Sequence, residues 1–188
     1  MTYSESSIIK KNTNKSKPTN FKIKDTETEM TINEVSIINP SIELNKTFTH
    51  IIDNYNFDHL TPKVCIEIFK DGRPFSHFIE KWIESNYPLK HISGCKQYDF
   101  VDINDESIKY DEKTFTNNGC NFCPSNMLGQ GRKFDKEVFE EKTKKMIFCI
   151  VSNVNFPEIK IKFIKGIELL NIYSNGKIPL KEHIKFFN

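Results

Sequence analysis

The chain has 188 residues, a hydrophobic fraction of 37% and a formal net charge of +2, which suits one domain with a real hydrophobic core. No apolar run approaches the roughly 20 residues of a membrane-spanning helix, so a membrane protein is excluded. The first residues also lack the apolar stretch of a secretory signal. We therefore expect a protein that is not secreted and stays in the cell interior, in the cytoplasm or nucleoid, with its five cysteines as thiols or metal ligands.

The first 30 residues are rich in lysine, asparagine, serine and threonine and offer little to bury. Six lysines precede Asp25, whereas Glu5 is the only acid before it. This composition predicts a disordered segment over 1–30, followed by a folded domain over 31–188. The lysines would add salt-dependent, non-specific affinity for DNA.

The apolar spacing from residue 41 onward predicts a series of helices and strands. A helix with Ser41 as its N-cap is expected over 41–52, and the alternating "KVCIEIF" (63–69) reads as a short strand. The clearest helical pattern is "PFSHFIEKWIESNYP" (74–88), in which apolar residues recur at helical spacing until Pro88.

The second half of the chain continues with a hairpin over 96–116 and a charged helix over 134–145. The continuously apolar "MIFCIVSNV" (146–154) predicts a strand buried on both faces. The alternating "EIKIKFIKG" (158–166) predicts an edge strand with a lysine-rich outer face. Together these elements predict an α/β domain, with a mixed β-sheet flanked by helices.

The hairpin carries an unusual group of charges: Asp99, Asp102, Asp111, Glu112 and Lys113. Because side chains alternate along a strand, Asp111 and Lys113 share one face and Glu112 points to the other. The length of the turn decides which acid of the first strand joins Asp111. An odd number of loop residues selects Asp99 and an even number selects Asp102, and the sequence leaves both open.

Two carboxylates that converge beside a lysine suit a divalent-metal site for phosphodiester hydrolysis. Mg²⁺ prefers hard oxygen ligands and is typically bound by one or two carboxylates together with substrate phosphate oxygens. The lysine would orient a water molecule or neutralise developing charge. The alternative is a solvated surface hairpin, because exposed strands often carry acids and lysines.

The segments "YDFVDI" and "KYDEKTFT" resemble the core of the PD-(D/E)XK nuclease superfamily, to which most type II restriction endonucleases belong. The resemblance implies a restriction-endonuclease-like core, with Asp99 as the first acid, Asp111 as the second and Lys113 as the lysine. Glu112 stands where the family usually has an apolar residue.

The family often adds a glutamate from the preceding helix, and Glu80 is the nearest match. The implied function is Mg²⁺-dependent, sequence-specific cleavage of double-stranded DNA in the manner of a restriction enzyme, with Mn²⁺ as a substitute metal. Glu80, Asp99 and Asp111 would be the metal ligands, and a homodimer would cut both strands.

The loop that follows the hairpin holds residue types that contact DNA. Arginine, glutamine and asparagine can read base edges, and lysine binds phosphates. The predicted DNA contacts are Asn126, Gln130, Arg132 and Lys133. The same residue types are also ordinary in loops.

A second constellation is built from cysteine and histidine. Cys120 and Cys123 form a C-x-x-C pair, and His91 and Cys95 lie just before the hairpin, so a four-ligand zinc site is conceivable. This favours the main alternative function, a zinc-organised, non-catalytic nucleic-acid-binding protein. A third possibility is an interaction protein on a nuclease-like scaffold that has lost its activity.

Overall fold

A computed structural model of the chain describes residues 41–52, 59–94, 97–123 and 133–188. The segment 1–30, predicted to be disordered, lies outside these ranges. The described residues all belong to one unit, 37–188, and none of the helices they form is long and apolar enough to cross a membrane.

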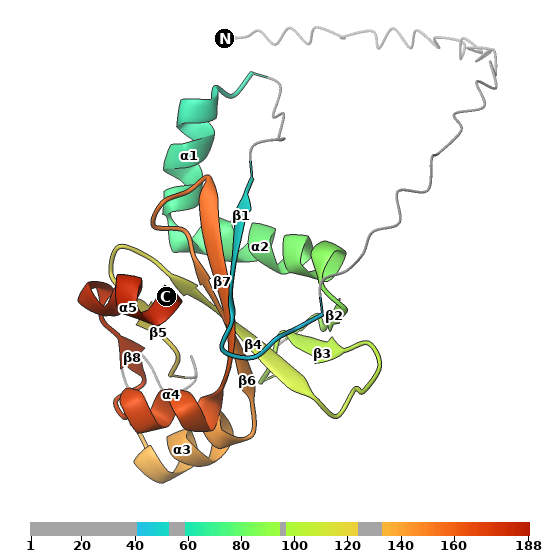
Figure 1. The fold of residues 1–188 in the computed structure, drawn as a ribbon, viewed down its shortest axis with the longest axis vertical. Helices are drawn as coiled ribbons and strands as arrows, with labels where there is room; N and C mark the ends of the chain where they lie inside the picture. The colour runs from blue at the N-terminus through green and yellow to red at the C-terminus, as the bar shows by residue number, and fades with distance from the viewer. Residues whose placement is uncertain (1–40, 53–58, 95–96, 124–132) are drawn as a thin grey trace, which may run out of the picture. The chain divides into compact units, whose positions relative to one another are not determined.

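A six-stranded mixed sheet organises the unit (Figure 1). Its strands, in sheet order, are β1 (Thr47–Ile51), β7 (Glu158–Lys165), β6 (Ile147–Ser152), β4 (Lys109–Phe115), β3 (Phe100–Asp102) and β2 (Leu89–His91). All neighbours are antiparallel except β4 and β6, which are parallel. Two short strands, β5 (Cys120–Asn121) and β8 (Lys177–Ile178), pair separately.

The helices cover both faces of the sheet. They are α1 (Pro62–Lys70), α2 (Gly72–Asn86), α3 (Lys136–Lys144), α4 (Gly166–Ile172), the 3₁₀ helix η2 (Leu180–Glu182) and α5 (His183–Phe187). Buried side chains of α1 and α2 form one hydrophobic cluster with the sheet, and those of α3, α4 and α5 form a second cluster. Alternate residues of β6 belong to opposite clusters, which explains why this strand is apolar throughout. The predicted α/β fold class with a mixed sheet flanked by helices is therefore confirmed.

The helix α2 is the element that the sequence predicted best. Its buried residues Phe75, Ile79 and Ile83 lie at i, i+4 and i+8, so they form one stripe against the sheet. Asp71 caps the helix through a bond from the Arg73 N–H to its Oδ1, at 3.0 Å. The charged helix α3, capped by Asp135, is confirmed as well.

Two early elements were predicted with the wrong type. Residues 47–51 form β1 rather than part of a helix, because they pair with the edge of β7. The prediction of an edge strand over 158–166 is therefore wrong, since β7 lies between β1 and β6. The expected strand over 63–69 is instead the helix α1. Thr61 caps it and Pro62 opens it, and its buried residues Cys65 and Phe69 are four apart.

Asn153 joins the end of β6 to the end of α1. Its buried side-chain amide donates to the Phe69 carbonyl at 2.8 Å and to the Lys70 carbonyl at 3.3 Å. These carbonyls belong to the last turn of the helix, where the regular ladder of helical hydrogen bonds ends. The amide therefore fixes where α1 ends and α2 begins.

Asn153→Ala should lower the free energy of unfolding by about 2 kcal/mol, because the α1 carbonyls lose their buried donor. Urea denaturation would measure this loss. Asn155→Ala, at an exposed position two residues later, is the matched control and should change the free energy by less than about 0.5 kcal/mol. Equal effects of the two variants would contradict a structural role for the Asn153 amide.

Candidate active site

The strand β4 extends beyond its neighbour β3. The two strands pair only at Phe100 with Tyr110 and at Val101 with Lys109, whereas β4 pairs with β6 along Tyr110–Phe115. As far as the described residues show, no strand pairs with the other edge of β4 beyond Tyr110. The backbone of Glu112 therefore meets side chains at this edge instead of a strand.

Asp99 occupies the start of this open edge. Its N–H donates to the Tyr110 carbonyl at 2.9 Å, and its Oδ2 accepts the Glu112 N–H at 2.7 Å. Asp102 has a different role, because its Oδ1 accepts the Asn104 N–H at 2.8 Å and shapes the loop of the hairpin. The register thus brings Asp99, and not Asp102, beside Asp111.

Asp111 and Lys113 lie on the same face of β4, as the alternation predicted. The Lys113 Nζ is 2.7 Å from the Asp111 Oδ2 and donates to the Glu112 carbonyl at 2.8 Å. Across the ladder, Asp111 and Lys113 oppose Phe148 and Ile150 of β6, which belong to the second hydrophobic cluster. The ion pair is therefore set against an apolar background, and Asp111 is only 9% exposed.

Burial perturbs both carboxyl groups of β4. It raises the pKa of Asp111 to about 7. Lys113 lowers this pKa, whereas the negative charge of Asp99 raises it. Burial likewise raises the pKa of Glu112 to about 8, although Lys113 and a hydrogen bond from Thr114 act in the opposite direction. Burial alone would lower the pKa of Lys113, but the surrounding acids, led by Asp111, raise it. The lysine therefore stays charged, and its positive charge interacts with all three acids.

The excess of acids over bases is the main electrostatic property of this group, which we call the β4 cluster (Asp99, Asp111, Glu112 and Lys113). Fully ionised, three carboxylates and one ammonium carry a charge of −2. Such a charge in a buried place is costly, and it is relieved either by protons or by a bound cation. A divalent cation has the matching charge, and carboxylate oxygens are suitable ligands for it.

Glu80 reaches the neighbourhood of the β4 cluster from α2. Its Oε2 is 3.2 Å from the His91 Nε2, and its charge raises the pKa of Glu112. Among the described residues, no three histidine, cysteine, aspartate or glutamate side chains are placed to bind one metal ion together. The structure thus brings Asp99 and Asp111 together without Glu80.

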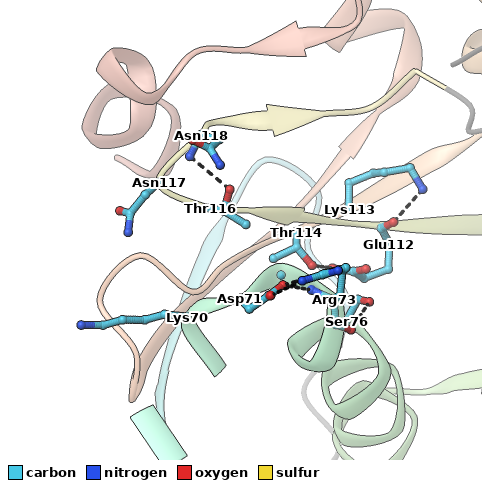
Figure 2. A pocket seen from close by; sticks show the side chains of 11 residues that line it. Lys70, Asp71, Arg73, Ser76, Glu112, Lys113, Thr114, Thr116, Asn117 and Asn118 are labelled. Carbon is cyan, nitrogen blue, oxygen red and sulfur yellow. Dashed lines mark hydrogen bonds and ion pairs between the residues drawn. The ribbon is translucent and has the colours of Figure 1, made fainter. Parts of the chain in front are cut away.

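An open pocket of about 650 Å³ adjoins the β4 cluster (Figure 2). It lies between the α1–α2 corner and the end of β4, and Glu112 and Lys113 belong to both the pocket and the cluster. Its other lining residues are Lys70, Asp71, Gly72, Arg73, Ser76, Thr114, Thr116, Asn117 and Asn118. Sequence reasoning missed Lys70, Arg73 and Ser76. The "KDGRP" turn would have indicated this region if it had been recognised as a corner between two helices.

The zinc ligands predicted from the sequence lie in different surroundings. His91 contacts Glu80 and Phe100, whereas Cys120 and Cys123 are buried in the second hydrophobic cluster. Burial raises the pKa of both thiols, which opposes the thiolate form that zinc requires. Cys95 lies outside the described residues.

Most of the predicted DNA-contacting loop also lies outside the described residues, including Asn126, Gln130 and Arg132. Lys133 is described and is exposed to solvent. Comparison of the chain with protein families, curated proteins and solved structures gives no match.

The raised pKa values of Asp111 and Glu112 predict that the apo protein loses stability as the pH rises. The folded state binds these protons more tightly than the unfolded state, so the stabilisation is complete below about pH 4. It is lost as the pH passes through about 7 for Asp111 and about 8 for Glu112.

Urea denaturation in chelator between pH 5 and pH 9 would measure this loss. Asp111→Asn should reduce the decline, because asparagine carries no charge at any pH. Asp102→Asn, which alters the acid at the end of β3, should leave the decline as it is. A decline that Asp111→Asn does not reduce would contradict the assigned pKa direction.

Proposed function

We propose that the protein is a Mg²⁺-dependent endonuclease that hydrolyses phosphodiester bonds of double-stranded DNA at the β4 cluster. The observation that carries the proposal is the pair of carboxylates, Asp99 and Asp111, packed at a strand edge with the Lys113 ammonium 2.7 Å from Asp111. Burying like charges together is unfavourable, so such pairs are typical of functional sites. The residue types and the open pocket beside them fit phosphate chemistry.

The topology around the cluster supports this proposal. In chain order, α2 is followed by the antiparallel strands β2, β3 and β4, then by the short strand β5, by α3 and by β6, which is parallel to β4. This is the order of helix, hairpin, helix and buried strand that the resemblance to PD-(D/E)XK nucleases implies. Asp99 lies directly before β3, and Asp111 and Lys113 lie within β4, as in that motif.

Each residue of the cluster would have a separate role in the reaction. Asp99 and Asp111 would bind Mg²⁺ or Mn²⁺ through their carboxylate oxygens, and water and substrate oxygens would complete the ligand set. When bound, the metal would polarise the phosphate and supply an activated water. Lys113 stays protonated beside Asp111, so it can orient the attacking water and stabilise negative charge at the phosphate.

A homodimer is part of this proposal. One cluster cuts one strand, so a break in both strands requires two clusters, and a two-fold pair of subunits would match a palindromic target.

Cleavage of mixed-sequence duplex DNA tests the function. The wild-type protein should produce discrete fragments with Mg²⁺ or Mn²⁺ and none with excess chelator. Asp111→Ala and Lys113→Ala should reduce the cleavage rate at least about a hundredfold, because each removes charge stabilisation at the reacting phosphate. Asp102→Asn is the control for a hairpin acid outside the cluster and should cleave at the wild-type rate.

Metal-dependent stabilisation tests the same site without turnover. Mn²⁺ should raise the melting temperature of the wild-type protein, because a ligand that binds only the folded state stabilises it. The rise should be absent in Asp111→Asn and retained in Asp102→Asn. Either of two results would overturn the assignment. One is DNA cleavage at the wild-type rate by both Asp111→Ala and Lys113→Ala, and the other is a rise in melting temperature with Mn²⁺ in Asp111→Asn.

A further inference from the structure

The pocket beside the β4 cluster has two walls that are fixed against each other. One wall is the α1–α2 corner, which Asn153 fixes to the sheet. The other wall is the end of β4 with the turn that follows it, closed by reciprocal backbone bonds between Thr116 and Gly119. The walls meet at Gly72, where an added Cβ would lie 2.9 Å from the Thr116 Cγ2. The pocket is therefore formed before any ligand binds.

The charge of the lining favours an anion. Lys70, Arg73 and Lys113 are cationic. Asp71 is one of the lining acids, and its pKa is lowered to about 2, chiefly by the hydrogen bond from the Arg73 side chain. Glu112 is the other lining acid, so the three cations outnumber the two acids even when both acids are ionised. The pocket thus presents net positive charge directly beside the acidic cluster.

The remaining lining side chains are neutral hydrogen-bonding groups: Ser76, Thr114, Thr116, Asn117 and Asn118. Hydroxyl and amide groups of this kind make many of the phosphate and sugar contacts in protein–DNA interfaces. Figure 2 shows Asn117 and Asn118 at the turn after β4 and Arg73 across from them at the start of α2. Polar groups therefore flank the pocket on both walls.

Arg73 is positioned to exchange partners. Its Nη2 lies 2.7 Å and its Nε 3.2 Å from the two Asp71 carboxylate oxygens, yet its side chain is 90% exposed. An ion pair in water is weak, so a phosphate can compete for the same planar donors. Asp71 would retain its other bond, from the Arg73 N–H, and continue to cap α2.

We propose that this pocket binds the phosphate backbone of the DNA strand beside the scissile bond, with Arg73 exchanging Asp71 for a phosphate. The inference rests on the proposed function for the identity of the strand, but binding can be measured apart from cleavage. Arg73 is then a substrate-positioning residue, and Lys70 is a second cation of the same lining. Asp71 weakens binding, because it competes for the guanidinium and adds a negative charge to the pocket.

Two variants with opposite effects test the exchange. Binding of a short fluorescein-labelled duplex DNA to the full chain would be measured by anisotropy in chelator, so that no cleavage occurs. Arg73→Ala should weaken binding about fivefold to tenfold and reduce the slope of log K against log salt by about one. Asp71→Asn should tighten binding severalfold, since asparagine can still accept the Arg73 N–H and cap the helix.

The ion pair between Lys90 and Glu106 supplies matched controls. Its Nζ and Oε1 atoms are 3.1 Å apart, and neither residue lines the pocket. Lys90→Ala and Glu106→Gln change the net charge by the same amounts as the test variants and should shift affinity less than twofold. If the test and control variants shift the DNA affinity equally, net charge alone explains the effect and the pocket proposal is wrong.

Failure of the pocket and failure of the nuclease assignment give different results. If cleavage requires Asp111 while Arg73→Ala and Asp71→Asn bind DNA like the wild type, the pocket proposal is wrong and the active site stands. If the two variants shift binding in opposite directions but no metal supports cleavage, the pocket stands and the nuclease assignment fails. No binding of duplex DNA at low salt would overturn the pocket directly.

Discussion

The difference in length between two neighbouring strands is the constraint on which the candidate site depends. Because β3 pairs with β4 only as far as Tyr110, the Glu112 N–H has no strand to bond and is satisfied by the Asp99 carboxylate instead. A buried N–H without a partner is costly, so this bond fixes Asp99 close to Asp111. The convergence of two acids thus follows from backbone hydrogen bonding at an open strand edge.

The β4 cluster holds more negative charge than its lysine balances. Lys113 is the single cation among three acids, and the surroundings on the Asp111 side are apolar. Asp99 also lies directly against the backbone of Glu112, so its charge adds to that of both buried acids. A domain that only needed stability would be served better by apolar side chains here, because buried ionic groups rarely add net stability. The unfavourable charge is understandable if the cluster binds a cation and a phosphate.

The acidic cluster and the basic pocket are neighbours because the α1–α2 corner packs beside the end of β4. Asn153 and Gly72 are responsible for this placement. The amide of Asn153 reaches the last carbonyls of α1, and Gly72 lets the start of α2 approach Thr116. Lys70 and Arg73, which precede Lys113 by 43 and 40 residues in the chain, thereby come to line the same space.

The sequence by itself determined the elements with long, regular patterns. The apolar stripe of α2, the charged α3, the doubly buried β6 and the shared face of Asp111 and Lys113 all follow from local periodicity, which does not depend on distant partners. Short segments were different. The alternation of 63–69 predicted a strand, but Thr61 and Pro62 begin a helix there, and its residues Cys65 and Phe69 are buried on one side. Residues 47–51 became a strand because β7 offered an edge.

Tertiary structure likewise decided three features of the site. They are the choice between Asp99 and Asp102, the separation of His91 from the two cysteines, and the pocket at the α1–α2 corner. Each depends on strand register or on contacts between residues far apart in the chain, which no local pattern encodes.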